Sequence, residues 1–248
     1  MISDRPQEAH WLPARERDYL VTTLAAERAA KQAEAPVSKA PVKDVFGNAG
    51  LMKLVILNFF YQTGDYGYTL WLPTILKGLT GGNMASVGFL AVLPFVATLA
   101  GIYVISLFSD HSGKRRLWVR FSLYSFAAAL VASVVLRDQM VAAYIALVIC
   151  GFFLKSATSP FWSMPGRIAS PEVAGSARGV INGLGNLGGF CGPYLVGVMM
   201  YLYGQNVAVC ALAGSLIIAG TMTFLLPKQC DLVDSDSDVA IKNQPRNA

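Results

Sequence analysis

The middle of the chain carries almost no charge. The 179 positions from 49 to 227 hold ten basic and four acidic side chains, whereas the 48 residues before them hold fourteen charges and the 21 residues after them hold seven. In a soluble domain about a quarter of the side chains are charged, because the surface must face water. This middle section cannot supply such a surface. It therefore predicts a protein whose solvent is the lipid bilayer.

Six apolar windows are each long enough to cross a membrane as a helix, which needs about 20 residues. They cover residues 54–76, 84–108, 117–136, 139–162, 179–203 and 205–226. The sequence thus predicts an all-α membrane protein with a six-helix transmembrane bundle over residues 49–227. The segment 1–48 is expected to hold a surface helix over 14–32 and a proline-containing linker over 34–44, and residues 228–248 a disordered tail.

The distribution of basic residues predicts the orientation. Six spans return both termini to one side of the membrane, and the short loops on that side carry five basic residues against two on the opposite side. The five are Lys114, Arg115, Arg116, Arg167 and Arg178, and the two are Lys77 and Arg137. Because basic loops stay in the cytoplasm, both termini are expected there. The net charge of +5 then reflects topology, and nucleic acid is not expected as a partner.

One window, NGLGNLGGFCGPYLVGVMM (182–200), holds six glycines and a proline on an uncharged background. GLGNLG matches the dinucleotide fingerprint, but that site needs a preceding strand and a later acidic residue, and neither is present. In lipid, small residues instead let helix backbones approach closely. Gly185, Gly189 and Gly192 predict one packing stripe, Gly188 and Gly192 a second, and Pro193 predicts a kink.

No constellation for a metal, a cofactor or catalysis stands out. The cysteines, Cys150, Cys191, Cys210 and Cys230, lack metal-ligand spacing and are interpreted as packing residues. The spans contain one carboxylate, no histidine and no H-E-x-x-H or G-x-S-G pattern, so an enzyme is not expected.

Several stretches are similar to one transporter family. Its last third is similar to SPFWSMP (159–165) and GVINGLGNLGGFCGPYLVG (179–197). Its seventh helix resembles YGYTLWLPTIL (66–76), and the end of its cytoplasmic central loop resembles WLPARERDYL (11–20). The family is the anion:cation symporters of the major facilitator superfamily. SDHSGKRR (109–116) resembles the loop motif of that superfamily. The resemblance covers nearly the whole chain.

What the resemblance implies is transport. Such proteins have twelve helices in two six-helix halves, and this chain resembles the second half. It implies alternating-access symport of a proton with an organic anion, a carboxylate or a sugar acid, in the plasma (bacterial inner) membrane. Its partners would be the anion, the proton and a missing N-terminal half. The alternative is a truncated, non-transporting membrane protein that only associates with a partner.

The loop motif implies a gate. By resemblance, Asp110, Gly113, Lys114, Arg115 and Arg116 would stabilise one state of the transport cycle through charge contacts with neighbouring helix ends. The chain departs from the motif, because Ser106 replaces its glycine and His111 its usual arginine. Positive-inside topology also explains the basic cluster, although it gives no reason for Asp110 or Gly113.

Lys155 lies inside the fourth window, where an unpaired ammonium is costly. Helical spacing would put Lys155, Ser159 and Trp162 on one face. We predict that Lys155 binds a substrate carboxylate and that Ser159 and Trp162 shape the pocket. The alternative is that Lys155 snorkels to the cytoplasmic interface, over about 15 Å.

In the first window, Asn58, Tyr61, Gln62 and Asp65 form a polar stripe at helical spacing. A carboxylate in a low-dielectric site can carry a proton, so Asp65 is the candidate for proton coupling. The alternative is that it lies near the outer interface and stays hydrated. Tyr61 and Gln62 are predicted to form hydrogen bonds with the substrate, and aromatic packing is the alternative for Tyr61.

Asn182 and Asn186 share one face of the glycine-rich window, four residues apart. A carboxamide in hydrocarbon needs partners. They are predicted either to hold helices together or to line a polar substrate cavity, and the spacing does not separate the two.

Overall fold

The computed structural model describes residues 11, 13–18, 21–22, 42–169 and 173–231. It separates into two compact units, residues 1–40 and 41–248. In the first unit, residues 14–18 are helical, within the predicted surface helix. Most of the predicted linker and of the C-terminal tail lies outside the described residues.

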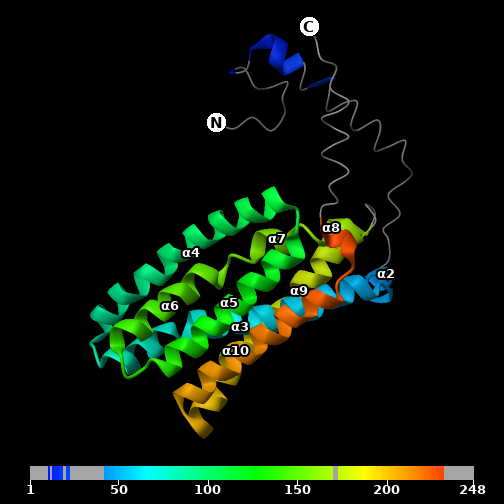
Figure 1. The fold of residues 1–248 in the computed structure, drawn as a ribbon. Helices are drawn as coiled ribbons and strands as arrows, with labels where there is room; N and C mark the ends of the chain where they lie inside the picture. Colours follow the sequence, from blue (N-terminus) through cyan, green and yellow to red (C-terminus); the bar gives the residue numbers. More distant parts are fainter. Residues whose placement is uncertain (1–10, 12, 19–20, 23–41, 170–172, 232–248) are drawn as a thin grey trace. The chain divides into compact units, whose positions relative to one another are not determined.

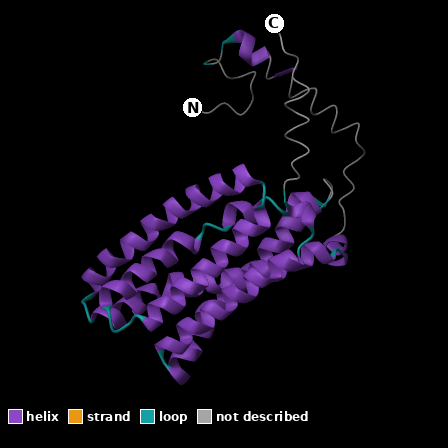
Figure 2. Cartoon of the chain, viewed as in Figure 1, coloured by secondary structure: helices purple, strands orange, loops and turns teal. Residues whose placement is uncertain are grey.

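The second unit is built from helices, and its described part contains no strand (Figure 2). The helices follow one another along the chain as α2 (Val42–Gly47), α3 (Ala49–Thr80), α4 (Met84–Ser112), α5 (Arg115–Val135), α6 (Met140–Leu154), α7 (Thr158–Trp162), α8 (Pro165–Ile168), α9 (Ala174–Tyr203), α10 (Gln205–Met222), η2 (Thr223–Leu225) and η3 (Lys228–Cys230). The all-α prediction is therefore confirmed for the described residues.

Each apolar window lies in a helix or a run of short helices, and four of these stretches have the length and composition to cross a membrane. They are Met84–Ser112, Arg115–Val135, Met140–Ile168 and Gln205–Leu225. Helices α3 and α9 are longer, with 32 and 30 residues. They are less apolar, because α3 carries a polar stripe and α9 is rich in glycine.

Local chemistry explains where the long helices start and stop. The Asn48 side chain accepts hydrogen bonds from the backbone N–H groups of Gly50 and Leu51, which caps the start of α3. Helices α3 and α4 both end at a glycine in the left-handed conformation, Gly81 at φ 61° and Gly113 at φ 66°. Glycine adopts this conformation without the steric cost of a side chain.

Helices α3 and α9 pack along each other, and glycine makes this close approach possible (Figure 1). A methyl group added at Gly188 would overlap the Phe59 carbonyl oxygen of α3, and one at Gly192 would overlap the Thr63 carbonyl oxygen. Gly189 lies against the Tyr66 ring. The glycine-rich window is thus a continuous helix with its small residues at a helix interface. It continues beyond Pro193 to Tyr203.

A second close contact joins α4 to α6. Gly101 of α4 lies against the carbonyl of Phe152, and Gly151 of α6 lies against that of Pro94. The Thr98 hydroxyl donates to the carbonyl oxygens of Pro94 and Gly151, at 3.0 and 2.9 Å. In Figure 1, α4 and α6 lie side by side, while α5 and α10 pack together next to α3.

Two expected boundaries differ from the structure. The window 139–162 is not one helix, because α6 ends at Leu154 and α7 begins at Thr158. The segment expected to be a disordered tail from 228 begins with the ordered turn η3, in which Cys230 is fully buried. Buried contacts of η3 with neighbouring helix ends explain why this segment is ordered.

Candidate functional site

The candidate site lies beside an interruption in the fourth apolar window. Residues 155–157 form a turn between α6 and α7, and Lys155 follows directly after the last residue of α6. An interrupted helix leaves backbone carbonyls without intrahelical partners. The Tyr61 hydroxyl of α3 donates to one of them, the Leu154 carbonyl, at 2.8 Å, and also lies 3.1 Å from the Thr158 hydroxyl.

Lys155 forms an ion pair with Asp65 of α3. The distance between Lys155 Nζ and Asp65 Oδ2 is 2.6 Å. The Asp65 side chain is 2% exposed and the Lys155 side chain 38% exposed. The ammonium also lies 5.5 Å from the centre of the Tyr66 ring, within the range of a cation–π interaction. Asp65 is thus buried and paired with a lysine, and Lys155 is turned toward α3.

The two oxygens of the Asp65 carboxylate differ in their surroundings. Oδ2 accepts a hydrogen bond from Lys155, whereas Oδ1 is buried without a hydrogen-bond partner among the described residues. A buried carboxylate with one unsatisfied oxygen depends strongly on its remaining charge partner. The pair therefore has one enclosed member and one member that can reach an incoming ligand.

A row of hydrogen-bonded carboxamide side chains joins α3 to α9. It begins at Gln62, three residues before Asp65 on α3. The Gln62 Nε2 donates to Asn186 Oδ1 at 2.8 Å, and the Asn186 Nδ2 donates to Asn182 Oδ1 at 3.0 Å. The first of these bonds joins two helices, as one of the two predictions for the asparagines requires. Both asparagines are also exposed, so the prediction that they line a cavity stays open.

Among the described residues, neither Ser159 nor Trp162 forms a hydrogen bond with the Lys155 side chain. Their predicted common face assumed a continuous helix, and the turn at 155–157 breaks it. Ser159 is exposed, and Trp162 packs its ring against Phe161, with 5.2 Å between the ring centres. Their role in shaping a pocket remains a prediction.

Tyr61 was predicted to form a hydrogen bond with the substrate, but its side chain is almost fully enclosed. Its side chain is buried and its hydroxyl is already hydrogen-bonded at the interruption. Asn58 was predicted only as a member of the polar stripe, without a role of its own. Its amide donates to the Ile181 carbonyl of α9 at 3.0 Å and lies against Gly185. The polar stripe of α3 thus points toward both α6–α7 and α9.

The loop-motif residues lie at one end of the bundle. Gly113 has a structural reason of its own, because it ends α4 in the left-handed conformation. Asp110 lies 3.9 Å from Arg115, with 69% of its side chain exposed, which makes it a weak ion pair. Lys114 precedes the first residue of α5 and is exposed. Arg116 pairs with a different residue, Asp231.

Asp231 holds several segments together at that end. Its carboxylate accepts from the Arg116 backbone N–H at 2.9 Å and from Arg116 Nε at 2.8 Å, and lies 2.7 Å from Arg116 Nη2. Arg116 also donates to the Leu226 carbonyl, and Arg167 to the Asp231 carbonyl. Burial raises the pKa of the neighbouring Cys230 thiol to about 11. We call Arg116, Arg167, Leu226, Cys230 and Asp231 the Asp231 cluster.

Sequence reasoning missed Asp231 because it is one of several aspartates in a polar tail. Its sole distinction in the sequence is that it follows the last apolar window closely. As for metals, the described residues contain no group of three or more histidine, cysteine or acidic side chains that could hold an ion.

Known proteins similar to this chain are transporters. The family description "Major Facilitator Superfamily" matches residues 6–193 and, in a second match, residues 54–237. A "Putative tartrate transporter" of Agrobacterium vitis is 29% identical over 228 residues, which cover 92% of this chain and 49% of that protein. The "Inner membrane transport protein RhmT" of Escherichia coli is 29% identical over 88% of this chain and 50% of its own length.

A "Quinolone resistance transporter" of Acinetobacter baumannii is 31% identical over 63% of this chain and 36% of its own length. The chain thus spans about half the length, or less, of these relatives. The family match covers the long helices and the interrupted window that holds Lys155, and the apolar helices are those of a multi-pass membrane protein. This chain belongs to the major facilitator superfamily.

Proposed function

We propose that this chain is the C-terminal half of a twelve-helix transporter that carries an organic anion together with a proton. The observation that supports this most is the ion pair, at 2.6 Å, between Asp65 of α3 and Lys155 in the turn between α6 and α7. A lysine–carboxylate pair at such a place is costly to bury and marks a functional site. The tartrate named for one relative is a dicarboxylate, which suits a lysine.

In this proposal the substrate carboxylate and Asp65 compete for the same ammonium. Lys155 has one strong partner, Asp65 Oδ2, and an ammonium held by an enclosed carboxylate is less available to a second anion. A proton on Asp65 removes that competitor. Proton binding therefore favours anion binding, and by thermodynamic reciprocity anion binding favours protonation.

The charge balance explains why one proton would accompany one carboxylate. The empty site holds one positive and one negative charge. After exchange with a monocarboxylate it holds the ammonium, the substrate carboxylate and a neutral Asp65, so the buried net charge stays at zero; the second carboxylate of a dicarboxylate would add one negative charge. A change in net charge within the membrane would cost several kcal/mol. This balance allows the occupied site to pass through the alternating-access cycle.

The carboxamide row would orient the substrate. Gln62, Asn182 and Asn186 offer both donors and acceptors, which suit the hydroxyl groups of a hydroxy acid or sugar acid. Their exposed face would be covered by the N-terminal half. In the proposal, Ser159 and Trp162 complete the pocket on the α7 side.

The proposed topology has six spans, with α3 and α9 as the two polar ones and both termini in the cytoplasm. At 1.5 Å per residue, helices of 32 and 30 residues exceed the roughly 30 Å of hydrocarbon. The basic end with Arg115 and Arg116 would then be cytoplasmic. Contacts of Asp110, Gly113, Lys114, Arg115 and Arg116 would stabilise one state of the cycle.

Uptake of labelled organic acids tests the proposal. Cells express the chain with and without a matching N-terminal half, and tartrate, sugar acids and a neutral sugar are compared at two external pH values. We expect anion uptake that rises as the external pH falls. Asp65→Asn should remove this pH dependence while exchange of labelled for unlabelled anion continues, and Lys155→Gln should abolish both.

Lys77→Gln is the matched control, because Lys77 is an exposed lysine of the same helix as Asp65. Uptake by Lys155→Gln at the level of this control would exclude Lys155 as the anion site. Unchanged pH dependence in Asp65→Asn would exclude Asp65 as the proton carrier.

A further inference from the structure

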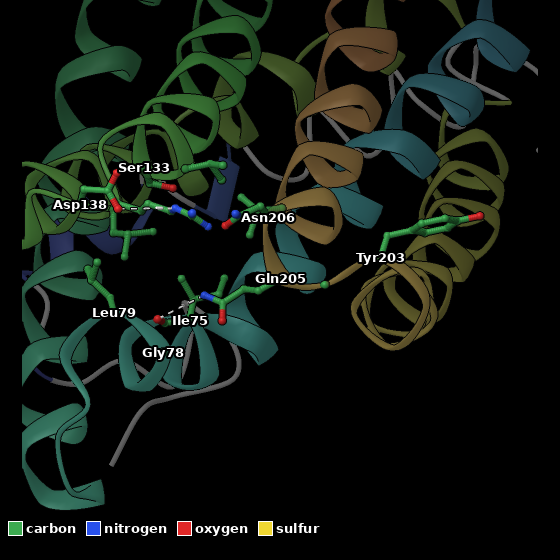
Figure 3. Close-up of a pocket in the computed structure, with 13 residues that line it drawn as sticks. Ile75, Gly78, Leu79, Ser133, Asp138, Tyr203, Gln205 and Asn206 are labelled. Atoms are coloured by element: carbon green, nitrogen blue, oxygen red, sulfur yellow. Dashed lines mark hydrogen bonds and ion pairs between the residues drawn. The ribbon is translucent and has the colours of Figure 1, made fainter.

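A second polar site lies away from the ion pair, at the opposite end of the bundle from the Asp231 cluster. It is a cavity of about 500 Å³ between the end of α3, the end of α5 and the start of α10. The polar side chains that line it are Ser133, Arg137, Asp138, Tyr203, Gln205 and Asn206. Figure 3 shows Ser133 and Asp138 on one wall and Gln205 and Asn206 on the facing helix.

The charges of this pocket cancel. Arg137 is the one cation and Asp138 the one anion among its lining residues, and Arg137 Nε lies 3.7 Å from Asp138 Oδ1. Their side chains are 59% and 92% exposed. Such an exposed pair is weak, so both groups can turn to a ligand at little cost. A ligand with one positive and one negative group would replace one weak ion pair by two.

The amide side chains add donors and acceptors to the pocket. Gln205 Nε2 donates to the Ile75 carbonyl at 3.5 Å, at the limit of a hydrogen bond. Gly78 faces Gln205, and a methyl group added there would lie 2.5 Å from Gln205 Oε1. The absence of a side chain at Gly78 therefore leaves space for the Gln205 amide in the wall of the pocket.

A separate apolar groove lies along a different, outward face of α5. It has a volume of about 710 Å³, is lined by side chains of α5 between Tyr124 and Leu136 and by Ile217 of α10, and its polar surface is negligible. It shares no lining residue with the pocket, which lies at the end of α5 on the side of Ser133 and Val134. Tyr201 and Tyr203, both exposed, lie at this end of α9. Tyrosines are enriched where a membrane meets water.

We infer that this pocket binds the headgroup of an ethanolamine phospholipid. The phosphate would contact Arg137 and the Asn206 amide, the primary ammonium would contact Asp138, and the acyl chains would stay in the surrounding bilayer. An anionic headgroup without an ammonium leaves Asp138 facing the phosphate. A quaternary choline headgroup has no N–H to donate to the carboxylate. The site is built from this chain alone.

Native mass spectrometry of the purified full chain tests this inference. The protein is mixed with equal amounts of phosphatidylethanolamine, phosphatidylglycerol and phosphatidylcholine, and the bound fraction of each is measured. We expect the ethanolamine lipid to be preferred. The variant Arg137→Gln should weaken binding of both phosphatidylethanolamine and phosphatidylglycerol about tenfold, the effect of losing one charged hydrogen bond.

The second variant has a different expected pattern. Asp138→Asn should weaken phosphatidylethanolamine and strengthen phosphatidylglycerol, because the pocket becomes positive. Lys77→Gln removes an exposed cation from the same end of the bundle but not from the pocket, so it should change neither.

Two results would overturn the inference. One is equal binding of all three lipids by the unaltered chain, or lipid binding by the Arg137 and Asp138 variants that does not differ from that of Lys77→Gln. The other is displacement of the bound lipid by free phosphoethanolamine at equal concentration, which would assign the pocket to a soluble zwitterion.

Discussion

Removing Lys155 should destabilise the protein far more than removing its partner. In Lys155→Gln the Asp65 carboxylate, 2% exposed, loses its cation, and its Oδ1 already has no hydrogen-bond partner among the described residues. Breaking a buried ion pair from one side costs about 3–5 kcal/mol. Because the Lys155 side chain is 38% exposed, water already screens part of the interaction, and we expect a loss of about 3 kcal/mol.

The reverse variant, Asp65→Asn, should cost about 1 kcal/mol. The Lys155 ammonium, which stays in this variant, is the more exposed member of the pair and can turn to water at little cost. The double variant Asp65→Asn with Lys155→Gln leaves no buried charge, so its stability should return to within about 1 kcal/mol of the original chain. The second change thereby rescues the first.

The pH dependence separates lost charge from lost packing. In Lys155→Gln, a fall in pH adds a proton to Asp65 and removes the unpaired buried charge, so this variant should gain stability as the pH falls. The double variant has no such carboxylate and should not. Unfolding in mixed micelles with increasing sodium dodecyl sulfate, followed by tryptophan fluorescence at several pH values, measures both.

Additive losses in the double variant would refute this reasoning. Equal losses in the two single variants would do the same, because the asymmetry follows from the different exposure of the two side chains.

Two further predictions use matched controls. Gly188→Ala should destabilise the bundle by about 1–3 kcal/mol, since its methyl group meets the backbone of α3. The control Gly183→Ala on the same helix meets nothing within 4 Å and should be neutral. Equal unfolding curves for the two variants would contradict the close approach of α3 and α9. Asp231→Asn should loosen the Asp231 cluster, so that maleimide labels Cys230 faster at pH 8, where its raised pKa keeps it protonated and slow. Asp138→Asn, exposed by 92%, should leave labelling unchanged, and a slow Cys230 in both would show that Asp231 does not hold the turn closed.

Much of the helical architecture could be predicted from composition. A chain with so few charges must satisfy its backbone hydrogen bonds internally in lipid, and helices do so. This reasoning identified α9 as a helix despite its eight glycines, and some of these glycines marked its packing face. It ended the second window at residue 108, whereas α4 continues to Ser112. It also missed the interruption after Leu154, because an apolar turn has the same composition as an apolar helix.

The candidate site could be predicted only as separate residues. The cost of a charge in lipid marked Lys155 and Asp65, and helical spacing marked the stripe with Gln62. Their pairing joins positions 90 residues apart in the chain. It depends on how α3 packs against the turn between α6 and α7.

The sequence by itself determined the solvent, the class of secondary structure and the side chains too polar to be idle in a membrane, because these follow from composition and local periodicity. The tertiary structure decided which of them meet. Asp231 reaches Arg116 across 115 positions, and the pocket at Arg137 is closed by the start of α10. Such contacts arise from the packing of helices that are distant in the chain, and no local pattern encodes them.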